Sequence, residues 1–313
     1  MRTTLSICSF LLLAIVTAAG NEADTPDSDN RSGPAASGGT CKEDLPAGPN
    51  SATPAGAAFS WPKGARGALS ISFDDARGSQ VDHHSSALFK KHGIRVTYFV
   101  SLANVEKKLD LWRAVVADGH EIGNHSLQHP CSGNFPWIGD GESALENYSL
   151  PKIEAELLEA NRRIGEMLGV TPVSYAYPCG LDFVGRGERR ASYVPVVARH
   201  FLVGRGYRGE YANNPIFCDL SMVQGFGADH DDLSALKAYA DQAINSGYWI
   251  ILIAHEVPEH PGGDGMSTGN IAALCSYLQS KPELWVETIG TVGAYVQSRR
   301  NLDATSTVEQ EKR

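Results

Sequence analysis

Strand-like and helix-like hydrophobic patterns alternate along the chain from residue 67 onward. The segments 68–73 and 248–254 predict buried strands, the second of them apolar throughout, and three further strands are expected at 95–100, 121–124 and 173–177. Because helix-like segments separate these strands, the pattern favours βα units around a parallel sheet over segregated layers. We therefore expect an α/β fold.

The helix-like segments have apolar residues three or four positions apart. The clearest, 151–168, has proline in its first turn and stops at Gly169. A later helix that ends at Gly247 is expected to be capped by Asp231 or Asp232. The remaining helices are expected at 79–91 and 109–116.

The two ends of the chain differ from this pattern. Residues 1–20 combine Arg2, an apolar run too short to span a bilayer and small residues, which predicts a secretory signal peptide. Residues 21–60 are rich in Pro, Gly, Ala, Ser and Asp, which predicts a disordered linker. One domain is expected at 61–298, followed by a polar, frayed tail at 299–313. The protein is expected in the periplasm, at the cell surface or in the medium.

The charge excludes one class of partner. The chain carries 27 Lys and Arg against 36 Asp and Glu, a net charge of −9, with no basic cluster. Affinity for nucleic acid comes mostly from Lys and Arg that neutralise phosphates. Nucleic acid is therefore not expected to be a partner, and no membrane span is expected after signal cleavage.

Chemically active groups recur where predicted strands end. They are Asp74 and Asp75, His125 and His129, the segment Tyr177 to Gly180, and His255. In barrels of βα units such groups gather at the C-terminal ends of the strands, so we expect four segments to converge. Two imidazoles and one carboxylate are three ligands for a divalent metal, and a second carboxylate can act as a base. This set of groups is typical of a metal-assisted hydrolase.

Each group also has a simpler interpretation. Adjacent aspartates are often solvated, and two histidines four apart, which would share one side of a helical turn, arise by chance in a chain with ten histidines. By itself, His255 is more typical of a hydrogen-bonded core histidine. Cys179 is more typical of packing or a disulfide than of a nucleophile. Trp137 lies in the loop after the histidine pair and either packs at a rim or flanks a groove.

The cysteines are consistent with export. Of six cysteines, Cys8 lies in the predicted signal peptide, which leaves an odd number in a compartment where disulfides persist. The five are Cys41, Cys131, Cys179, Cys218 and Cys275. Their pairing does not follow from the sequence alone, but Cys131 and Cys179 both belong to candidate site segments. We hypothesise a disulfide between these two.

Four segments together resemble the polysaccharide deacetylase family, also called the NodB-homology or carbohydrate esterase 4 family, over residues 67–297. They are Ser72-Phe73-Asp74-Asp75, His125-Ser126-x-x-His129, Tyr177-Pro178-Cys179-Gly180 and Leu252-Ile253-Ala254-His255. The resemblance implies a distorted (β/α) barrel. It also implies metal-dependent removal of acetyl groups, usually from N-acetylglucosamine units in polymers.

The resemblance also implies roles for individual residues. Asp74 would be the general base, and His255 the acid that protonates the leaving amine. The metal ligands would be Asp75, His125 and His129. The backbone N–H of Cys179 would stabilise the oxyanion, with Tyr177 in the same substrate-binding segment. Zinc suits two histidines and one aspartate, while Co²⁺, Mn²⁺ or Ni²⁺ could exchange with it.

The third segment departs from the family pattern. The family commonly has an arginine that braces the catalytic aspartate where this chain has Ala176, and tyrosine where it has Cys179. We expect Arg205 to supply the missing cation from another strand end, because a guanidinium beside a buried carboxylate keeps it ionised.

The sequence thus predicts a secreted, metal-dependent deacetylase acting on N-acetyl groups of glycans. One alternative is an esterase that removes O-acetyl groups, for example from xylan, with the same metal and base. The other is a catalytically silent carbohydrate-binding homologue. The presence of both Asp74 and His255 argues against the silent homologue, because binding alone needs neither base nor acid.

Overall fold

The computed structural model describes residues 59–139, 141–260 and 265–311, with side chains as far as residue 301. The predicted signal peptide and residues 21–58 of the predicted linker lie outside the described residues. Within them, one sheet contains eight strands: β1 (Gly67–Phe73), β2 (Thr97–Val100), β3 (Glu121–Asn124), β4 (Ser174–Ala176), β7 (Val203–Arg205), β8 (Phe226–Gly227), β9 (Trp249–Ala254) and β10 (Leu284–Val286). A separate antiparallel pair is formed by β5 (Phe183–Val184) and β6 (Ala191–Ser192).

The large sheet is parallel and curls toward closure. Its order is β7, β4, β3, β2, β1, β9, β8, with β10 paired to the first residues of β1. Val223, just before β8, forms a parallel bridge with Arg205 at the end of β7, so the two ends of the order approach each other. The Gly206 N–H donates to the Val223 carbonyl at 2.8 Å beside this bridge. The expected distorted (β/α) barrel is therefore confirmed.

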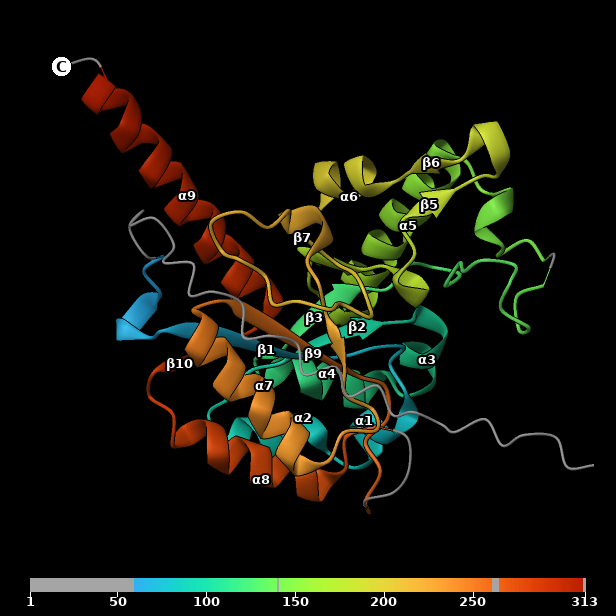
Figure 1. The fold of residues 1–313 in the computed structure, drawn as a ribbon. Helices are drawn as coiled ribbons and strands as arrows, with labels where there is room; N and C mark the ends of the chain where they lie inside the picture. The colour runs from blue at the N-terminus through green and yellow to red at the C-terminus, as the bar shows by residue number, and fades with distance from the viewer. Residues whose placement is uncertain (1–58, 140, 261–264, 312–313) are drawn as a thin grey trace, which may run out of the picture. The chain divides into compact units, whose positions relative to one another are not determined.

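Helices cover the outside of the sheet (Figure 1). They are α1 (Gly78–Asp82), α2 (Ser85–Lys91), α3 (Leu102–Lys107), α4 (Leu109–Ala117), α5 (Leu150–Leu168), α6 (Val194–His200), α7 (Leu233–Ser246), α8 (Thr268–Gln279) and α9 (Ile289–Glu311). Helices α2, α7 and α8 pack together near β1, whereas α5 and α6 pack beside β3 and β7. None of the helices in the described residues combines the length and apolarity needed to cross a bilayer.

The apolar runs occupy the core as predicted. Every residue of β1 and of β9 is buried, and the two strands pair in parallel register from Ala68 with Trp249 to Phe73 with Ala254. Asp232, one of the two predicted caps, accepts a hydrogen bond from the Ala235 N–H. The register brings the chain segments that follow the two strands side by side.

Two predictions were wrong. The helix expected at 79–91 is broken into α1 and α2, because His84 has a left-handed backbone with φ of 52°. The tail expected to fray from Arg299 instead continues α9 to Glu311. This segment contains neither glycine nor proline, so its polar composition does not interrupt the helix.

Candidate active site

The carboxylate pair lies at a sharp turn after β1. The Asp74 N–H still donates to the Ala254 carbonyl at 2.9 Å, which continues the pairing with β9. Asp75 and Ala76 then take positive φ values of 71° and 53°, a conformation that is rare for residues other than glycine. Such a turn directs the two neighbouring carboxylates to different partners, and strain of this kind is characteristic of functional sites.

A buried glutamine holds the ends of β1 and β9 together. The Gln80 amide donates to the Asp74 carbonyl at 2.7 Å and to the His255 carbonyl at 2.6 Å. Gln80 is fully buried, so these bonds are shielded from water. The backbone of Asp74 is thereby fixed relative to that of His255. Gln80 lies inside α1, and the sequence offered no signal for this function.

Asp75 and the two histidines bring three donor atoms together. Asp75 Oδ1 lies 3.4 Å from His125 Nε2 and 3.4 Å from His129 Nε2. All three donor atoms lie within 4.8 Å of one another. Two ligands of a tetrahedral metal at about 2.1 Å are separated by about 3.4 Å, so the spacing fits a divalent metal.

Neighbouring groups orient these donors. His125 Nδ1 donates to the Ala176 carbonyl at 3.0 Å, which leaves Nε2 with its lone pair for a ligand. The second carboxylate oxygen of Asp75 pairs with Arg77 Nη2 at 2.8 Å, which leaves Oδ1 toward the histidines. The histidines lie on a loop and not on a helical turn, because Ser126 and His129 have φ of 64° and 50°.

The protonation states suit metal ligands. Burial and the charge of His125 lower the pKa of His129 to about 4, although the carboxylate of Asp75 acts in the opposite direction. The imidazole of His129 is therefore neutral at physiological pH. Burial alone would raise the pKa of Asp75, but the neighbouring His125, His129 and Arg77 hold that pKa well below its usual range. The two groups are thus in the forms that bind cations.

Asp74 is paired with the arginine that was expected to replace the missing cation. Arg205 is 0% exposed and its Nη2 donates to Asp74 Oδ1, so the ion pair is buried. Ala176 and Arg205 are register partners on β4 and β7, which explains how an arginine from the next strand reaches the same place. Burial would raise the pKa of Asp74, but Arg205 and the nearby histidines keep it below the ordinary value.

His255 has a carboxylate partner that we did not predict. Its Nδ1 lies 2.6 Å from Asp229 Oδ2, and its N–H donates to Asp229 Oδ1 at 2.7 Å. Burial lowers the pKa of His255, but the Asp229 hydrogen bond and the charge of Asp74 outweigh it and raise the pKa to about 9. Asp229 follows β8, a strand of only two residues. Active groups are expected at the C-terminal ends of strands, so Asp229 would have been a candidate if this short strand had been recognised in the sequence.

Tyr177 and Cys179 lie on the turn after β4, where they were expected. The Tyr177 hydroxyl donates to the Ser221 carbonyl at 2.7 Å, and the Tyr177 side chain is nearly fully buried. Tyr177 therefore supports one side of the cleft. Cys179 has φ of 56° at the apex of the turn, where the Gly180 N–H donates to the Tyr177 carbonyl at 2.9 Å. Both residues line the same cleft as the metal-binding group.

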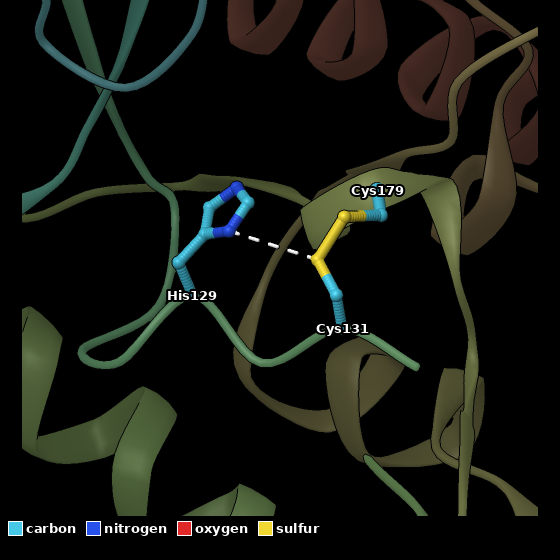
Figure 2. Close-up of side chains that lie close together, drawn as sticks. All are labelled: His129, Cys131 and Cys179. Carbon is cyan, nitrogen blue, oxygen red and sulfur yellow. Dashed lines mark hydrogen bonds between the residues drawn. A yellow bond between two sulfur atoms is a disulfide. The ribbon is translucent and has the colours of Figure 1, made fainter. Parts of the chain in front are cut away.

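The hypothesised disulfide between Cys131 and Cys179 is confirmed. Figure 2 shows it beside His129, whose Nδ1 lies 3.7 Å from Cys131 Sγ. The bond joins the loop of the second histidine to the turn after β4. Both sulfur atoms are occupied in it, so they do not add thiolate ligands to His129. Of the other cysteines in the described residues, Cys218 and Cys275 are free.

Removal of this disulfide is expected to destabilise the protein. The bond closes a loop of 48 residues, for which loop-closure entropy predicts a contribution of about 4 kcal/mol to the free energy of unfolding. We expect the double variant Cys131→Ala/Cys179→Ala to lose this amount in urea denaturation, and the reduced wild type to match it. Cys218→Ala is the control, because Cys218 is unpaired. Equal stability of the double variant and this control would contradict the prediction.

These groups share one cleft of about 420 Å³. Asp74, Asp75, both histidines and His255 line it, as do the aromatic residues Phe135, Trp137 and Tyr207. Of the two interpretations of Trp137, packing at a rim or flanking a groove, the structure thus supports the second. A cleft of this size with a few converging polar groups is typical of a binding site for a small molecule or one part of a polymer.

Comparisons with known proteins agree with this site. The polysaccharide deacetylase family model matches residues 62–184. Peptidoglycan-N-acetylglucosamine deacetylase PgdA of Listeria monocytogenes is 23% identical over 36% of this chain and 21% of its own length. The chitooligosaccharide deacetylase of Sinorhizobium fredii is 30% identical over 33% of this chain and 43% of its own length. The chain thus spans less than half of the length of these relatives.

A solved structure from Mycobacterium smegmatis, assigned to the polysaccharide deacetylases, has the same fold. It aligns with 78% of this chain and 95% of its own, with a TM-score of 0.56 and 15% identity. The segment matched by the family model contains the carboxylate pair, both histidines and the turn at Cys179. With these groups assembled in one cleft of a distorted barrel, residues 62–184 form a segment that matches the polysaccharide deacetylase family.

Proposed function

We propose that the protein is a secreted, metal-dependent deacetylase that hydrolyses N-acetyl groups of N-acetylglucosamine-containing glycans to acetate and free amine. The observation that carries this proposal is the spacing of Asp75, His125 and His129, with Asp74 beside them and His255 lining the same cleft. The relatives named for deacetylation of peptidoglycan and chitooligosaccharides support the same substrate class.

Asp75, His125 and His129 would hold the metal. Two imidazoles and one carboxylate suit Zn²⁺ best, and Co²⁺, Mn²⁺ or Ni²⁺ are chemically compatible. When bound, a divalent metal lowers the pKa of a water molecule and polarises the acetyl carbonyl. Arg77 and the Ala176 carbonyl keep the ligand atoms turned toward the site.

Asp74 acts as the general base in this proposal. Its pKa lies below the ordinary value, so the carboxylate is ionised and accepts a proton from the attacking water. Asp74 Oδ1 is engaged by Arg205, while Oδ2 lies 3.9 Å from His125 Nε2 and is directed toward the metal-binding group. The backbone N–H of Cys179 donates to the oxyanion that forms when the water oxygen bonds to the carbonyl carbon.

His255 acts as the general acid. With a pKa near 9 its imidazolium form is present at neutral pH, and it can give a proton to the sugar nitrogen as the C–N bond breaks. Asp229 fixes the ring orientation through Nδ1 and leaves Nε2 for the substrate. An amide nitrogen leaves poorly without a proton, whereas an ester oxygen needs less help. The paired acid therefore favours the N-acetyl reaction over O-acetyl esterase activity.

Export is part of the same proposal. Disulfides persist in oxidising compartments, and Cys131–Cys179 joins two loops of the cleft. The signal-like pattern of residues 1–20 supports the same conclusion. We propose a location in the periplasm, at the cell surface or in the medium, where acetylated polysaccharides occur.

Acetate release tests the function. We expect metal-loaded protein to release acetate from N-acetylglucosamine oligomers, chelation to abolish the release, and Zn²⁺ to restore it. Acetylated xylan is the parallel substrate, and preferential release from it would favour the esterase instead. A protein that binds Zn²⁺ and the oligomers but releases no acetate would support the silent carbohydrate-binding homologue.

A further inference from the structure

One positive charge that lines the cleft has no opposite charge beside it among the described residues. Arg208 is exposed and lines the same cleft as Asp74 and His255. Its guanidinium carbon lies 5.6 Å from the centroid of the Tyr207 ring, and it forms no ion pair with a carboxylate in the described part of the chain. A contact with a ring face leaves the five N–H donors of the guanidinium free. Arg208 can therefore bind an anionic group that enters the cleft.

The other charges at the cleft are balanced. Three pairs of opposite charge lie in or beside it: Asp74 with Arg205, Asp75 with Arg77, and His255 with Asp229. Arg77 Nη2, on the other guanidinium that lines the cleft, lies 2.8 Å from Asp75 Oδ2, and Arg77 Nε lies 3.8 Å from Glu256 Oε1. Because these pairs cancel, Arg208 leaves the cleft with an excess of positive charge.

The acidity of the whole chain does not remove this excess. The chain carries a net charge of −9, but charges in water are largely screened beyond about 8 Å at physiological ionic strength. A ligand in the cleft therefore responds mainly to nearby groups, Arg208 among them. The acidic surface weakens the attraction of anions from a distance, whereas a guanidinium at the site selects among molecules that have already reached it.

The backbone at Arg208 has a conformation that favours glycine. Arg208 has φ of 61°, in the left-handed region that residues with a Cβ atom rarely adopt. Gly209 follows directly, but the left-handed position itself carries the long, charged side chain. Backbone strain of this kind clusters at functional sites, where a particular side chain is needed at that position.

Hydrogen bonds on both sides hold this turn in place. The Gly206 N–H donates to the Val223 carbonyl at 2.8 Å, and the Gly209 N–H donates to the Gly225 carbonyl at 2.9 Å. Arg208 lies between these two bonds in the chain. A residue whose backbone is fixed before binding loses less conformational entropy when its side chain contacts a ligand.

Tyr207 places the turn next to the proposed acid. A methyl group added at Gly180 would lie 2.8 Å from Tyr207 Cβ, and one added at Gly227 would lie 2.9 Å from the tyrosine hydroxyl. The tyrosine thus fits closely against both glycines. Its ring packs edge-on to the His255 ring, with centroids 6.0 Å apart. Arg208 is thereby held near the group that would protonate the leaving nitrogen.

We propose that Arg208 binds a carboxylate of the glycan, on the sugar that reacts or on the sugar next to it. The planar guanidinium offers two parallel N–H groups that match the two oxygens of a carboxylate. The preferred substrate is then an acidic glycan, in which the N-acetylated amino sugar bears a carboxylate or is linked to a sugar that bears one. This inference rests on the proposed function and names its substrate class.

Selectivity between charged and neutral substrates tests the proposal. Two acidic tetrasaccharides are compared, in which N-acetylglucosamine alternates either with glucuronic acid or with its own 3-O-lactyl ether. Their neutral counterparts have the carboxylates converted to amides. We expect kcat/KM for acetate release to be about tenfold higher for at least one acid than for its amide, and this ratio to fall in high salt. The acid that shows the preference identifies the source of the carboxylate, whereas equal rates for acid and amide in both series would overturn the proposal.

Variants of Arg208 show whether this residue carries the preference. Arg208→Gln is expected to bring the ratio of acid to amide close to one, and Arg208→Lys to keep part of it, because lysine retains the charge but not the planar fork. Arg190→Gln is the matched control and is expected to keep the full ratio. Arg190 is also exposed and packs over the ring of Phe183, but it does not line this cleft. An unchanged ratio in Arg208→Gln, including an equal loss for acid and amide, would overturn the proposal.

Binding separates this proposal from the proposed function. Asp74→Asn protein loaded with Zn²⁺ is titrated with the acidic tetrasaccharides by calorimetry, with and without Arg208→Gln. Because both proteins carry Asp74→Asn, the expected tenfold loss of affinity reports on Arg208. If this loss is seen while metal-loaded wild type releases no acetate from any of the glycans, the proposed function fails and the carboxylate site stands. If wild type releases acetate but neither affinity nor the ratio depends on Arg208, the proposed function stands and the carboxylate site fails.

Discussion

Asp74→Asn is expected to reduce acetate release about a thousandfold while the protein still binds its metal. The amide has nearly the same shape as the carboxylate but cannot accept a proton from water. The proposed ligands Asp75, His125 and His129 are unchanged in this variant, so metal content is expected to remain one ion per chain. The measurement is kcat on N-acetylglucosamine oligomers, with metal content determined in the same preparation.

A matched variant distinguishes loss of the base from loss of the metal. Asp75→Asn is expected to lose both metal and activity, because Asp75 Oδ1 lies 3.4 Å from both histidine nitrogens. The melting temperature of each variant shows whether the fold persists, since Asp74→Asn leaves the Arg205 charge without a buried partner. Full turnover by folded Asp74→Asn would sink the assignment of Asp74 as the base.

The sequence predicted those parts of the site that follow long, apolar strands. Asp74, Asp75 and His255 were identified because β1 and β9 are buried along their whole lengths, and a polar residue directly after such a strand is conspicuous. Asp229 follows β8, which has only two residues and no recognisable hydrophobic period. Strand ends are informative only where the strand itself can be recognised.

Contacts between distant segments were harder to predict. Gln80 gives no local signal, because its function depends on two carbonyl groups that the β1 and β9 register brings together. The Cys131–Cys179 disulfide and the Asp74–Arg205 pair were stated as hypotheses, and the fold confirms both contacts. The break at His84 depends on a left-handed residue that no pattern in the sequence marks.

Arg205→Ala is expected to reduce turnover about a hundredfold with metal still bound. Without the guanidinium, Asp74 loses the partner that fixes its Oδ1 and keeps it ionised, and a displacement of about 1 Å is enough for such a loss. Removal of one member of a buried ion pair also costs about 3–5 kcal/mol of stability. Arg205→Lys keeps the charge but not the reach of the planar guanidinium, so intermediate turnover is expected.

The strand register offers a stricter test of the same idea. Ala176 and Arg205 are direct neighbours on parallel strands β4 and β7, so their side chains point to the same side of the sheet. The exchange Ala176→Arg/Arg205→Ala moves the guanidinium to the place where the family commonly has it, into space that the shortened side chain vacates. We expect this double variant to recover at least tenfold of the turnover lost in Arg205→Ala. Unchanged turnover in folded Arg205→Ala would show that Asp74 needs no positively charged partner. Recovery in the double variant would show that the site requires a guanidinium beside Asp74, whichever of the two strands carries it.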